Sequence, residues 1–435
     1  MPDDHILKLN LSKATHSGEK TLVFAGDFFL QRQPTRDISQ ILDQKLQKIL
    51  HEADAFGANM EAPIQGYGKE IGKVGPALAM CPQAPELLRK LGASWVSLAN
   101  NHAMDFGEKA LDATMQSLEK NKIDHVGAGQ KKNDAHRILI KKFNNGPELA
   151  IISACEYEFG IANDQHAGTA WIGSKRLIQN IQSAKAKGCF VIVCSHGGVE
   201  EVPLPSRERQ KKLRALIDAG ASLVVGHHPH VPQGWEFYQG KMICYSLGDF
   251  IFDRKNQNDK PWRNWGYLLK VTIDQDHHFN AEIVGYERVD DQIVCLGENR
   301  NAKQCFDYLL GLSEILQKDQ LQKYWPCVVN DLVTQRYSPF LEHIFTPLCQ
   351  PKTISDALKC LYQACRKSFN IRIGRRKKVD LDLSDLTLGR KLLFLNLIRC
   401  ESHLEVLRES LCDRKPLDTQ SQTKSLSLME AMFTL

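Results

Sequence analysis

The chain has 435 residues, of which 43% are hydrophobic and 25% are charged, and its net charge is +5. These values are typical of a globular protein with a buried core, and the length fits one large domain with an extension or two to three average domains. The small net charge gives no indication of a nucleic-acid partner, and no segment approaches the roughly 18 consecutive apolar residues of a membrane span.

The N-terminal segment and the cysteines bear on the cellular compartment. Residues 1–20 are polar and lack the basic start and apolar run of a secretory signal. The 13 cysteines lie between Cys81 and Cys412 without a CxxC pair, which indicates neither a disulfide framework nor a cysteine zinc site. We therefore expect a cytoplasmic protein with reduced thiols.

Short apolar runs alternate with amphipathic segments from Thr21 to about Gly285. The expected helices in this part are 38–50, 107–121 and 206–219. The expected strands are 21–25, 94–99, 150–154, 190–194, 222–226, 242–246, 267–273 and 279–284, with the last two forming a hairpin. Strands that alternate with helices predict an α/β domain built in layers.

The pattern changes after about residue 300, where strand signals end. Helices are expected at 306–316, 354–367 and 389–412, the last packed in the core rather than anchored in a membrane. The basic run 372–378 is interpreted as a solvated loop rather than a binding site for lipid, polyanion or nucleic acid. The predicted parts are a polar segment (1–20), an α/β domain (21–300), a helical extension (301–415) and a disordered tail (416–435).

Polar side chains follow directly on several of the predicted strands. Asp27, Asn101, His196 and the run His227–His230 each come at or just after a short apolar run. Ligands of α/β proteins collect at the carboxyl ends of strands, so these groups converge if the strands are neighbours.

The residue types indicate a transition-metal site. Carboxylate oxygens combined with imidazole nitrogens suit Zn, Mn or Fe better than Mg or Ca alone. Two such ions about 3.5–4 Å apart can hold a bridging hydroxide and clamp the attacking and leaving oxygens of a phosphoryl group. The pattern therefore favours a metal-dependent hydrolase site with two divalent ions of unknown identity.

An ordered series of motifs spans about 230 residues of the chain. The motifs are Gly26–Asp27, Asn59–Ile64, Leu98–Gly107, Ser195–Glu200, Gly226–Gln233 and Tyr245–Phe250. This series resembles the CapA or PGA_cap family of capsule and poly-γ-glutamate synthesis proteins, a branch of the calcineurin-like metallophosphatases. The resemblance covers residues 21 to about 290.

The resemblance implies a fold and a set of site residues. It implies a layered metallophosphoesterase-like β-sandwich flanked by helices, with His102 to protonate a leaving group or steady the transition state and Asp105 to orient His102. The metal ligands that it implies are Asp27, Glu61, Asn101, His196, His228 and His230.

Several neighbours of these residues have alternative interpretations. Strand alternation turns His227 away from His228, so His227 is not expected to be a ligand. Asn59 could hold a turn or face the substrate, while Glu200 and Glu201 are expected on a solvated face rather than on a substrate amine. Asp249 stands where the family usually has asparagine, which puts a substrate-carboxylate role there in doubt.

Three functions remain open from the sequence. The first is cleavage of a phosphoester in a small phosphorylated substrate. The second is assembly, release or hydrolysis of poly-γ-glutamate or a similar anionic capsule polymer, although members of that kind are typically anchored at the cell surface. The third is a scaffold without catalysis, against which the complete ligand set argues. The sequence does not identify the substrate, the metal or the oligomeric state.

Overall fold

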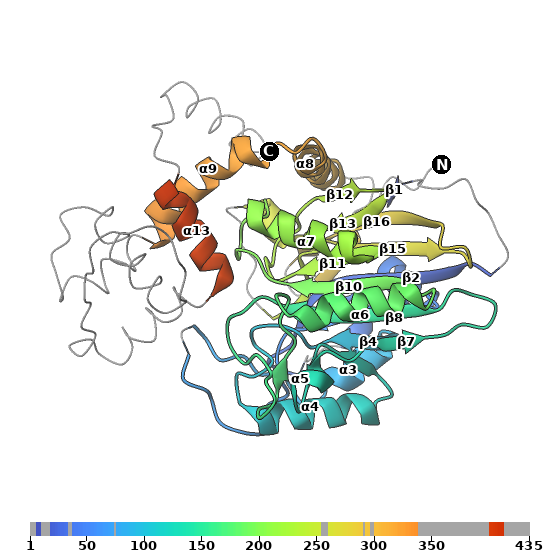
Figure 1. The fold of residues 1–435 in the computed structure, drawn as a ribbon. Coiled ribbons are helices and arrows are strands. Elements are labelled where there is room, and N and C mark those ends of the chain that lie inside the picture. Colours follow the sequence, from blue (N-terminus) through green and yellow to red (C-terminus); the bar gives the residue numbers. More distant parts are fainter. Residues whose placement is uncertain are drawn as a thin grey trace, which may run out of the picture.

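Two large β-sheets pack against each other in the computed structural model (Figure 1). It describes residues 6–9, 18–33, 37–73, 75–253, 260–289, 292–295, 300–337 and 400–412. The first sheet has nine strands and the second has six. The strands β6 (Ala128–Gly129) and β9 (Gly168–Thr169) form a third, two-stranded antiparallel sheet.

The first sheet is mixed, with parallel strands at its centre. Strands β2, β3, β4 and β5 are parallel neighbours, β14 pairs in parallel with β2, and β15 is antiparallel to β2. In sheet order the path is β1 (Ile6–Leu9), β16 (Phe279–Val289), β15 (Trp265–Ile273), β2 (Lys20–Phe29), β3 (Ala55–Met60), β4 (Ala93–Ser97) and β5 (Asp124–Val126), with β14 (Asp249–Phe252) beside β2 and β17 (Gln292–Cys295) beside β16.

The second sheet is parallel at its centre and antiparallel at both edges. Strands β8, β10, β11 and β13 are parallel. In sheet order the strands are β12 (Trp235–Tyr238), β13 (Lys241–Cys244), β11 (Leu223–His227), β10 (Phe190–His196), β8 (Leu149–Cys155) and β7 (Leu139–Lys141).

Side chains of β2 alternate between two hydrophobic cores. Leu22 and Phe24 belong to the core shared with the second sheet, whereas Val23 and Ala25 belong to the core on the opposite face. This alternation is the period of two that a strand imposes. Both faces of β2 are therefore buried, and the strand holds its carboxyl end in a fixed position.

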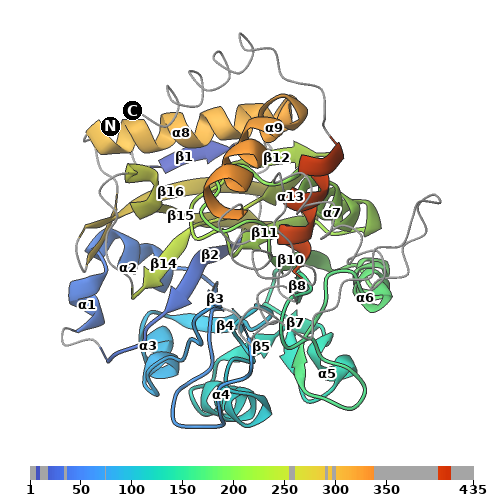
Figure 2. The ribbon, with the colours of Figure 1, turned by 90° about the vertical axis from the view of Figure 1, so that its left-hand side faces the viewer.

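Helices cover the outer faces of both sheets, and Figure 2 shows them on the two sides of the sheet layers. On the side of the first sheet lie α1 (Ile38–Ile41), α2 (Gln44–His51), α3 (Ala84–Lys90) and α4 (Glu108–Lys120). On the side of the second sheet lie α6 (Lys175–Ala186) and α7 (Arg207–Ala219), and the short α5 (Lys132–Ala135) and the 3-10 turn η1 (Pro261–Asn264) complete this part of the chain. The layered α/β fold that the sequence predicts is confirmed.

The described segments after residue 300 are helical, as predicted. They are α8 (Arg300–Gln317), α9 (Leu321–Leu332), the π-helical turn η2 (Val333–Tyr337) and α13 (Glu401–Cys412). Leu309 and Leu312 of α8 belong to the same core as the second sheet. A domain boundary near residue 300 stays a prediction. The predicted helix 354–367, the basic run 372–378 and the tail after residue 415 lie outside the described residues.

The structure differs from the expected elements in two respects. The single helix expected at 38–50 is wrong, because Leu42 forms a bridge with Ile293 and Asp43 accepts a hydrogen bond from the Lys45 amide to begin α2. Strands β3 and β14 and helices α3 and α6 are not among the expected elements. None of the helices in the described ranges combines the length and apolar character needed to cross a bilayer.

A glycine in β3 is required by the ring of a tryptophan. A Cβ atom added to Gly57 would lie 2.1 Å from Cε2 of Trp95 on the neighbouring strand β4. Gly57 thus gives the Trp95 ring its space between the strands.

We expect Gly57→Ala to lower the free energy of unfolding by about 1–3 kcal/mol, because the added methyl group overpacks the core. Urea denaturation monitored by tryptophan fluorescence measures this loss of stability. Gly72→Ala is the matched control, because a Cβ there meets no atom within 4 Å. Equal stability of the two variants would contradict the packing argument.

Candidate metal centre

The two large sheets meet at the carboxyl ends of β2 and β11. Nε2 of His227 lies 3.2 Å from the carbonyl oxygen of Ala25, and the His228 amide donates a hydrogen bond of 3.1 Å to Oδ2 of Asp27. The parallel strands therefore place their terminal side chains at one shared edge.

The structure brings all the residues predicted for the site to this edge and buries them. None of the eight is more than 8% exposed. They are Asp27, Glu61, Asn101, His102, Asp105, His196, His228 and His230. Their roles as ligands and catalytic groups stay predictions.

Asp27, His230 and Asp249 form one group of possible ligands, with ligand atoms within 4.8 Å of one another. Nδ1 of His230 lies 2.9 Å from Oδ1 of Asp249 and 3.5 Å from Oδ2 of Asp27. The pairing of β14 with β2 sets Asp249 directly opposite Asp27. Asp249 is thus a possible ligand that the sequence analysis did not include. Its position directly after the glycine of the last motif was the sequence feature that could have indicated it.

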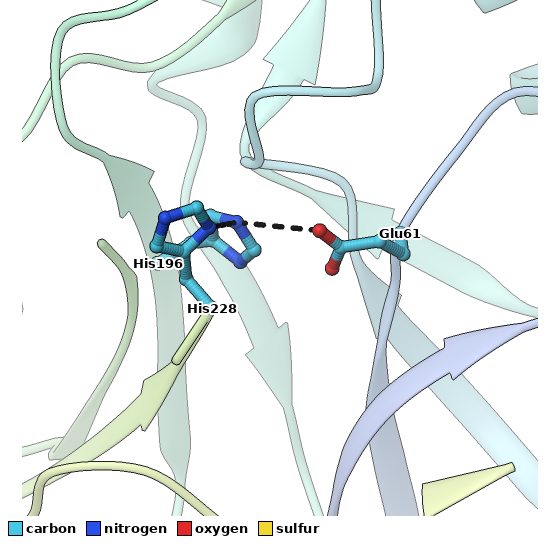
Figure 3. A group of neighbouring side chains, drawn as sticks. All are labelled: Glu61, His196 and His228. Atoms are coloured by element: carbon cyan, nitrogen blue, oxygen red, sulfur yellow. Dashed lines mark hydrogen bonds and ion pairs between the residues drawn. The ribbon is translucent and has the colours of Figure 1, made fainter. Parts of the chain in front are cut away.

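Glu61, His196 and His228 form a second group within the same 4.8 Å limit. Figure 3 shows the two imidazole rings side by side and facing the Glu61 carboxylate. Nδ1 of His228 lies 2.9 Å from Nε2 of His196, which lies 3.5 Å from Oε1 of Glu61. Glu200 forms a third group with His228 and His230, so His228 and His230 connect the three groups.

His228 and His230 adopt backbone conformations that are uncommon for residues with a side chain. Their φ angles are +97° and +60°. Residues with such strained backbone angles cluster at functional sites, where the surrounding structure compensates the free energy of the unfavourable conformation. The left-handed turns let two histidines so close in sequence both face the site. His227 remains in the regular strand β11 and belongs to none of the groups found among the described residues.

Three asparagines lie among the possible ligands. Nδ2 of Asn59 donates a hydrogen bond of 2.8 Å to Oδ1 of Asp27 and another to Oε2 of Glu61. Nδ2 of Asn100 donates to Oδ1 of Asn59 at 3.2 Å. Oδ1 of Asn101 lies 3.0 Å from Nε2 of His196, which places its amide oxygen beside the second group. Asn59 thus bridges two buried carboxylates, while a role toward the substrate stays a prediction.

The electrostatics of the site suit a bound cation. Burial and the negative charges of Asp27 and Asp249 raise the pKa of Glu61 well above its usual value. Oε1 of Glu61 accepts no hydrogen bond from any residue in the described part of the chain. A buried carboxylate oxygen without a donor is costly unless a cation compensates it. Glu61 therefore fits a metal ligand.

His196 and His228 have lowered pKa values, which favours the neutral form that ligation requires. Burial, followed by the neighbouring imidazoles, lowers the pKa of His196 well below its usual value. Burial likewise lowers the pKa of His228 to about 3, although Glu200 opposes this shift. Neutral imidazole is the form that binds a metal, so these groups fit divalent transition ions.

His102 is held by Asp105 and by a buried lysine. Nδ1 of His102 lies 2.7 Å from Oδ2 of Asp105, and Nζ of Lys73 lies 2.5 Å from Oδ1 of Asp105 and 3.1 Å from Nδ1 of His102. The Lys73 side chain is only 1% exposed. Lys73 lies in a glycine-rich polar segment that carries no motif, so no local pattern indicates its role.

Two glutamates near the site form ion pairs with arginines. Glu200 accepts a hydrogen bond of 3.0 Å from Arg336, and Glu201 forms an ion pair of 2.7 Å with Arg263. The side chains of Glu200 and Glu201 are 37% and 35% exposed, so their expected place on a solvated face stays a prediction. Glu200 contacts a residue that is far from it in the sequence, which sequence inspection has no means of finding.

Comparison with known proteins gives a family match and several relatives. The family described as "Bacterial capsule synthesis protein PGA_cap" matches residues 21–254. The chain is similar to "PGA biosynthesis protein CapA" of Bacillus subtilis (strain 168), with 30% identity over 53% of this chain and 63% of that protein. It is also similar to "Capsule biosynthesis protein CapA" of Bacillus anthracis, with 27% identity over 54% of this chain and 60% of that protein. The chain thus covers about three fifths of the length of these relatives.

A solved structure shows a weaker likeness. The protein TT1561 of Thermus thermophilus aligns with 59% of this chain and 98% of its own, at 11% identity and a TM-score of 0.32. This similarity is too low to support an argument. The matched family region contains every residue from Asp27 to Asp249 described above, whereas α8, α9, η2 and α13 lie beyond it.

We expect Glu61→Gln to stabilise the protein in the absence of metal and to weaken metal binding. The raised pKa of Glu61 means that this carboxyl group lowers the stability of the folded protein at neutral pH, and the loss is fully relieved only when the pH falls below the ordinary carboxyl pKa of the unfolded chain. The neutral amide should therefore raise the free energy of unfolding of the chelator-treated protein by on the order of 1–3 kcal/mol.

Urea denaturation of the chelator-treated protein and calorimetric titration with Mn²⁺ or Zn²⁺ measure the two effects. Glu52→Gln is the control, because that glutamate is exposed and distant from the site. A variant that is less stable without metal, or that binds metal as tightly as the wild type, would contradict this account of Glu61.

Proposed function

Because the chain belongs to the family of bacterial capsule synthesis proteins PGA_cap, we propose that it is a metal-dependent hydrolase that acts on poly-γ-glutamate or a similar anionic polymer. The observation that carries the proposal is the meeting of two groups of buried possible ligands at the carboxyl ends of two sheets. The match covers only part of the named relatives, so the polymer substrate is inferred from their names.

The donor set supports two neighbouring metal positions. Asp27, His230 and Asp249 would hold one ion, and Glu61, His196 and His228 would hold the other. Asn101 offers an amide oxygen beside His196. Two divalent ions supply charge that polarises the scissile group and lowers the pKa of a water molecule. Mn, Fe and Zn all suit these ligands.

The remaining site residues serve proton transfer. Burial lowers the pKa of His102, which is therefore a neutral imidazole at neutral pH. Asp105 and Lys73 both contact its Nδ1 and fix the orientation of the ring, so proton exchange with a substrate falls to Nε2. When Nδ1–H donates to Asp105, the neutral ring has a free lone pair at Nε2, so it would take a proton there from the attacking water and return it to the departing oxygen or nitrogen of the substrate.

A phosphoester is the second candidate substrate. Two neighbouring groups of oxygen and nitrogen ligands form the kind of site that clamps the attacking and leaving oxygens of a phosphoryl group. The same residues would hold the ions, so the two candidates differ in the bond that is cleaved and share the metal centre.

We expect the protein with added Mn²⁺ to release glutamate oligomers from poly-γ-glutamate. Chromatography of the products measures this reaction, and release of p-nitrophenol from bis-p-nitrophenyl phosphate measures the alternative.

His228→Ala should abolish turnover and weaken metal binding, because it removes a possible ligand from two groups. His102→Ala should lower kcat about 10²- to 10⁴-fold while the bound metal is retained.

His166→Ala is the matched control for both histidine variants, since that side chain is 70% exposed and outside the site. Turnover of the phosphoester alone would favour the second candidate. If metal analysis finds no bound transition ion and neither substrate is turned over, the proposed hydrolase activity is wrong and a role as a scaffold without catalysis is favoured.

A further inference from the structure

A residue from the helical segment beyond the matched family region reaches the candidate metal centre. Helix α9 runs into the turn η2, which carries Arg336. NH2 of Arg336 donates a hydrogen bond of 3.0 Å to Oε2 of Glu200, and NH1 donates one of 3.3 Å to the Glu200 carbonyl oxygen. Glu200 is in turn within 4.8 Å of the ligand nitrogens of His228 and His230. One side chain therefore separates the guanidinium from the metal centre.

We propose that Arg336 binds the anionic group of the substrate and so determines specificity at this site, an inference that rests on the proposed function. The substrate group is a carboxylate or a phosphate, which share oxygen acceptors and negative charge. A guanidinium carries five N–H donors in a planar fork that suits both groups. The two contacts to Glu200 leave further donors for such a ligand.

Arg336 and Glu200 form the edge of the cluster that solvent reaches. Their side chains are 32% and 37% exposed, whereas the carboxylates of Asp27 and Glu61 are completely buried. A substrate that approaches His228 and His230 from this edge meets the Arg336–Glu200 pair. Without the guanidinium, the carboxylate of Glu200 would repel an anionic substrate at this point.

The protein holds Arg336 in place through its neighbour. Tyr337 is completely buried, and its hydroxyl lies 2.8 Å from Nδ1 of His403 in α13. Figure 2 shows α9 and α13 together in front of the strand ends of the second sheet. The position of Arg336 is thus fixed from both α9 and α13, which reduces the entropy lost when it binds a ligand.

Helix α13 is itself fixed to α7 and to the segment between β9 and α6. Oε1 of Glu401 accepts a hydrogen bond of 2.6 Å from Nε1 of Trp171, and its Oε2 lies 2.8 Å from Nζ of Lys212. Ser206, which begins α7, donates a hydrogen bond of 2.6 Å to Glu405. These buried and part-buried polar contacts indicate that the helical segment has a defined docked position on the domain that carries the candidate metal centre.

The test is binding of two anions by the full chain and its variants. Poly-γ-glutamate and inorganic phosphate are titrated calorimetrically into wild type, Arg336→Ala, Arg336→Gln and Arg408→Ala, each with Mn²⁺ and again after chelation. Arg336→Ala should raise the Kd of the preferred anion about ten-fold or more, as expected for loss of a charge-assisted hydrogen bond. Arg408→Ala removes the same charge from an exposed position of α13 and should leave the Kd unchanged.

The comparison distinguishes recognition from a structural role. Arg336→Gln retains a hydrogen-bond donor toward Glu200 but lacks the charge. If Arg336→Ala does not fold, the Kd of Arg336→Gln shows whether Arg336 recognises the anion or only supports the structure. In steady-state assays Arg336→Gln should raise KM more than it lowers kcat. The anion whose Kd depends on Arg336 identifies the substrate class as carboxylate or phosphate.

Two results would overturn the inference. The first is a Kd for both anions that is the same in wild type, Arg336→Gln and Arg408→Ala, and the second is the absence of binding of either anion to the wild type. Binding that depends on Arg336 in a protein without turnover would instead support the inference while the proposed hydrolase activity fails.

Discussion

Buried negative charge at the junction of two sheets is the constraint on which the rest of this structure depends. Asp27, Glu61 and Asp249 are buried together, and burial, followed by repulsion from the two aspartates, raises the pKa of Glu61. Hydrogen bonds from Asn59 and from the His228 amide offset only part of this charge. Burial of carboxylates is tolerated only with good compensation, and two divalent cations would complete it.

The architecture supplies the rigidity that such a cluster requires. The strands that carry Asp27 and His196 are buried along most of their length. A packed core holds ligands at fixed positions, so little reorganisation is needed when an ion or substrate binds. The folding energy of the apolar layers thereby maintains a polar site that is unfavourable by itself, as is common where function and stability conflict.

Sequence patterns predict the site where polar residues follow uninterrupted apolar runs. Asp27 and His196 satisfy this condition, and their positions at strand ends follow directly. Strand β3 is not predicted because Gly57 breaks its pattern, and the reason for that glycine is the ring of Trp95 on the neighbouring strand. Lys73 and Arg336 are not predicted for a different reason. Their partners are set by tertiary packing, and no local pattern encodes such a contact.

The assembly of each ligand group from distant strands has a kinetic consequence. Asp27 comes from β2, His230 follows β11, and Asp249 begins β14, so one metal position requires three separate parts of the chain. Pairings between segments far apart in sequence form slowly, because the entropy of closing long loops must be lost first. Metal uptake by such a site would therefore be a late event in the folding of this chain. A bound ion would report that the two sheets have already come together.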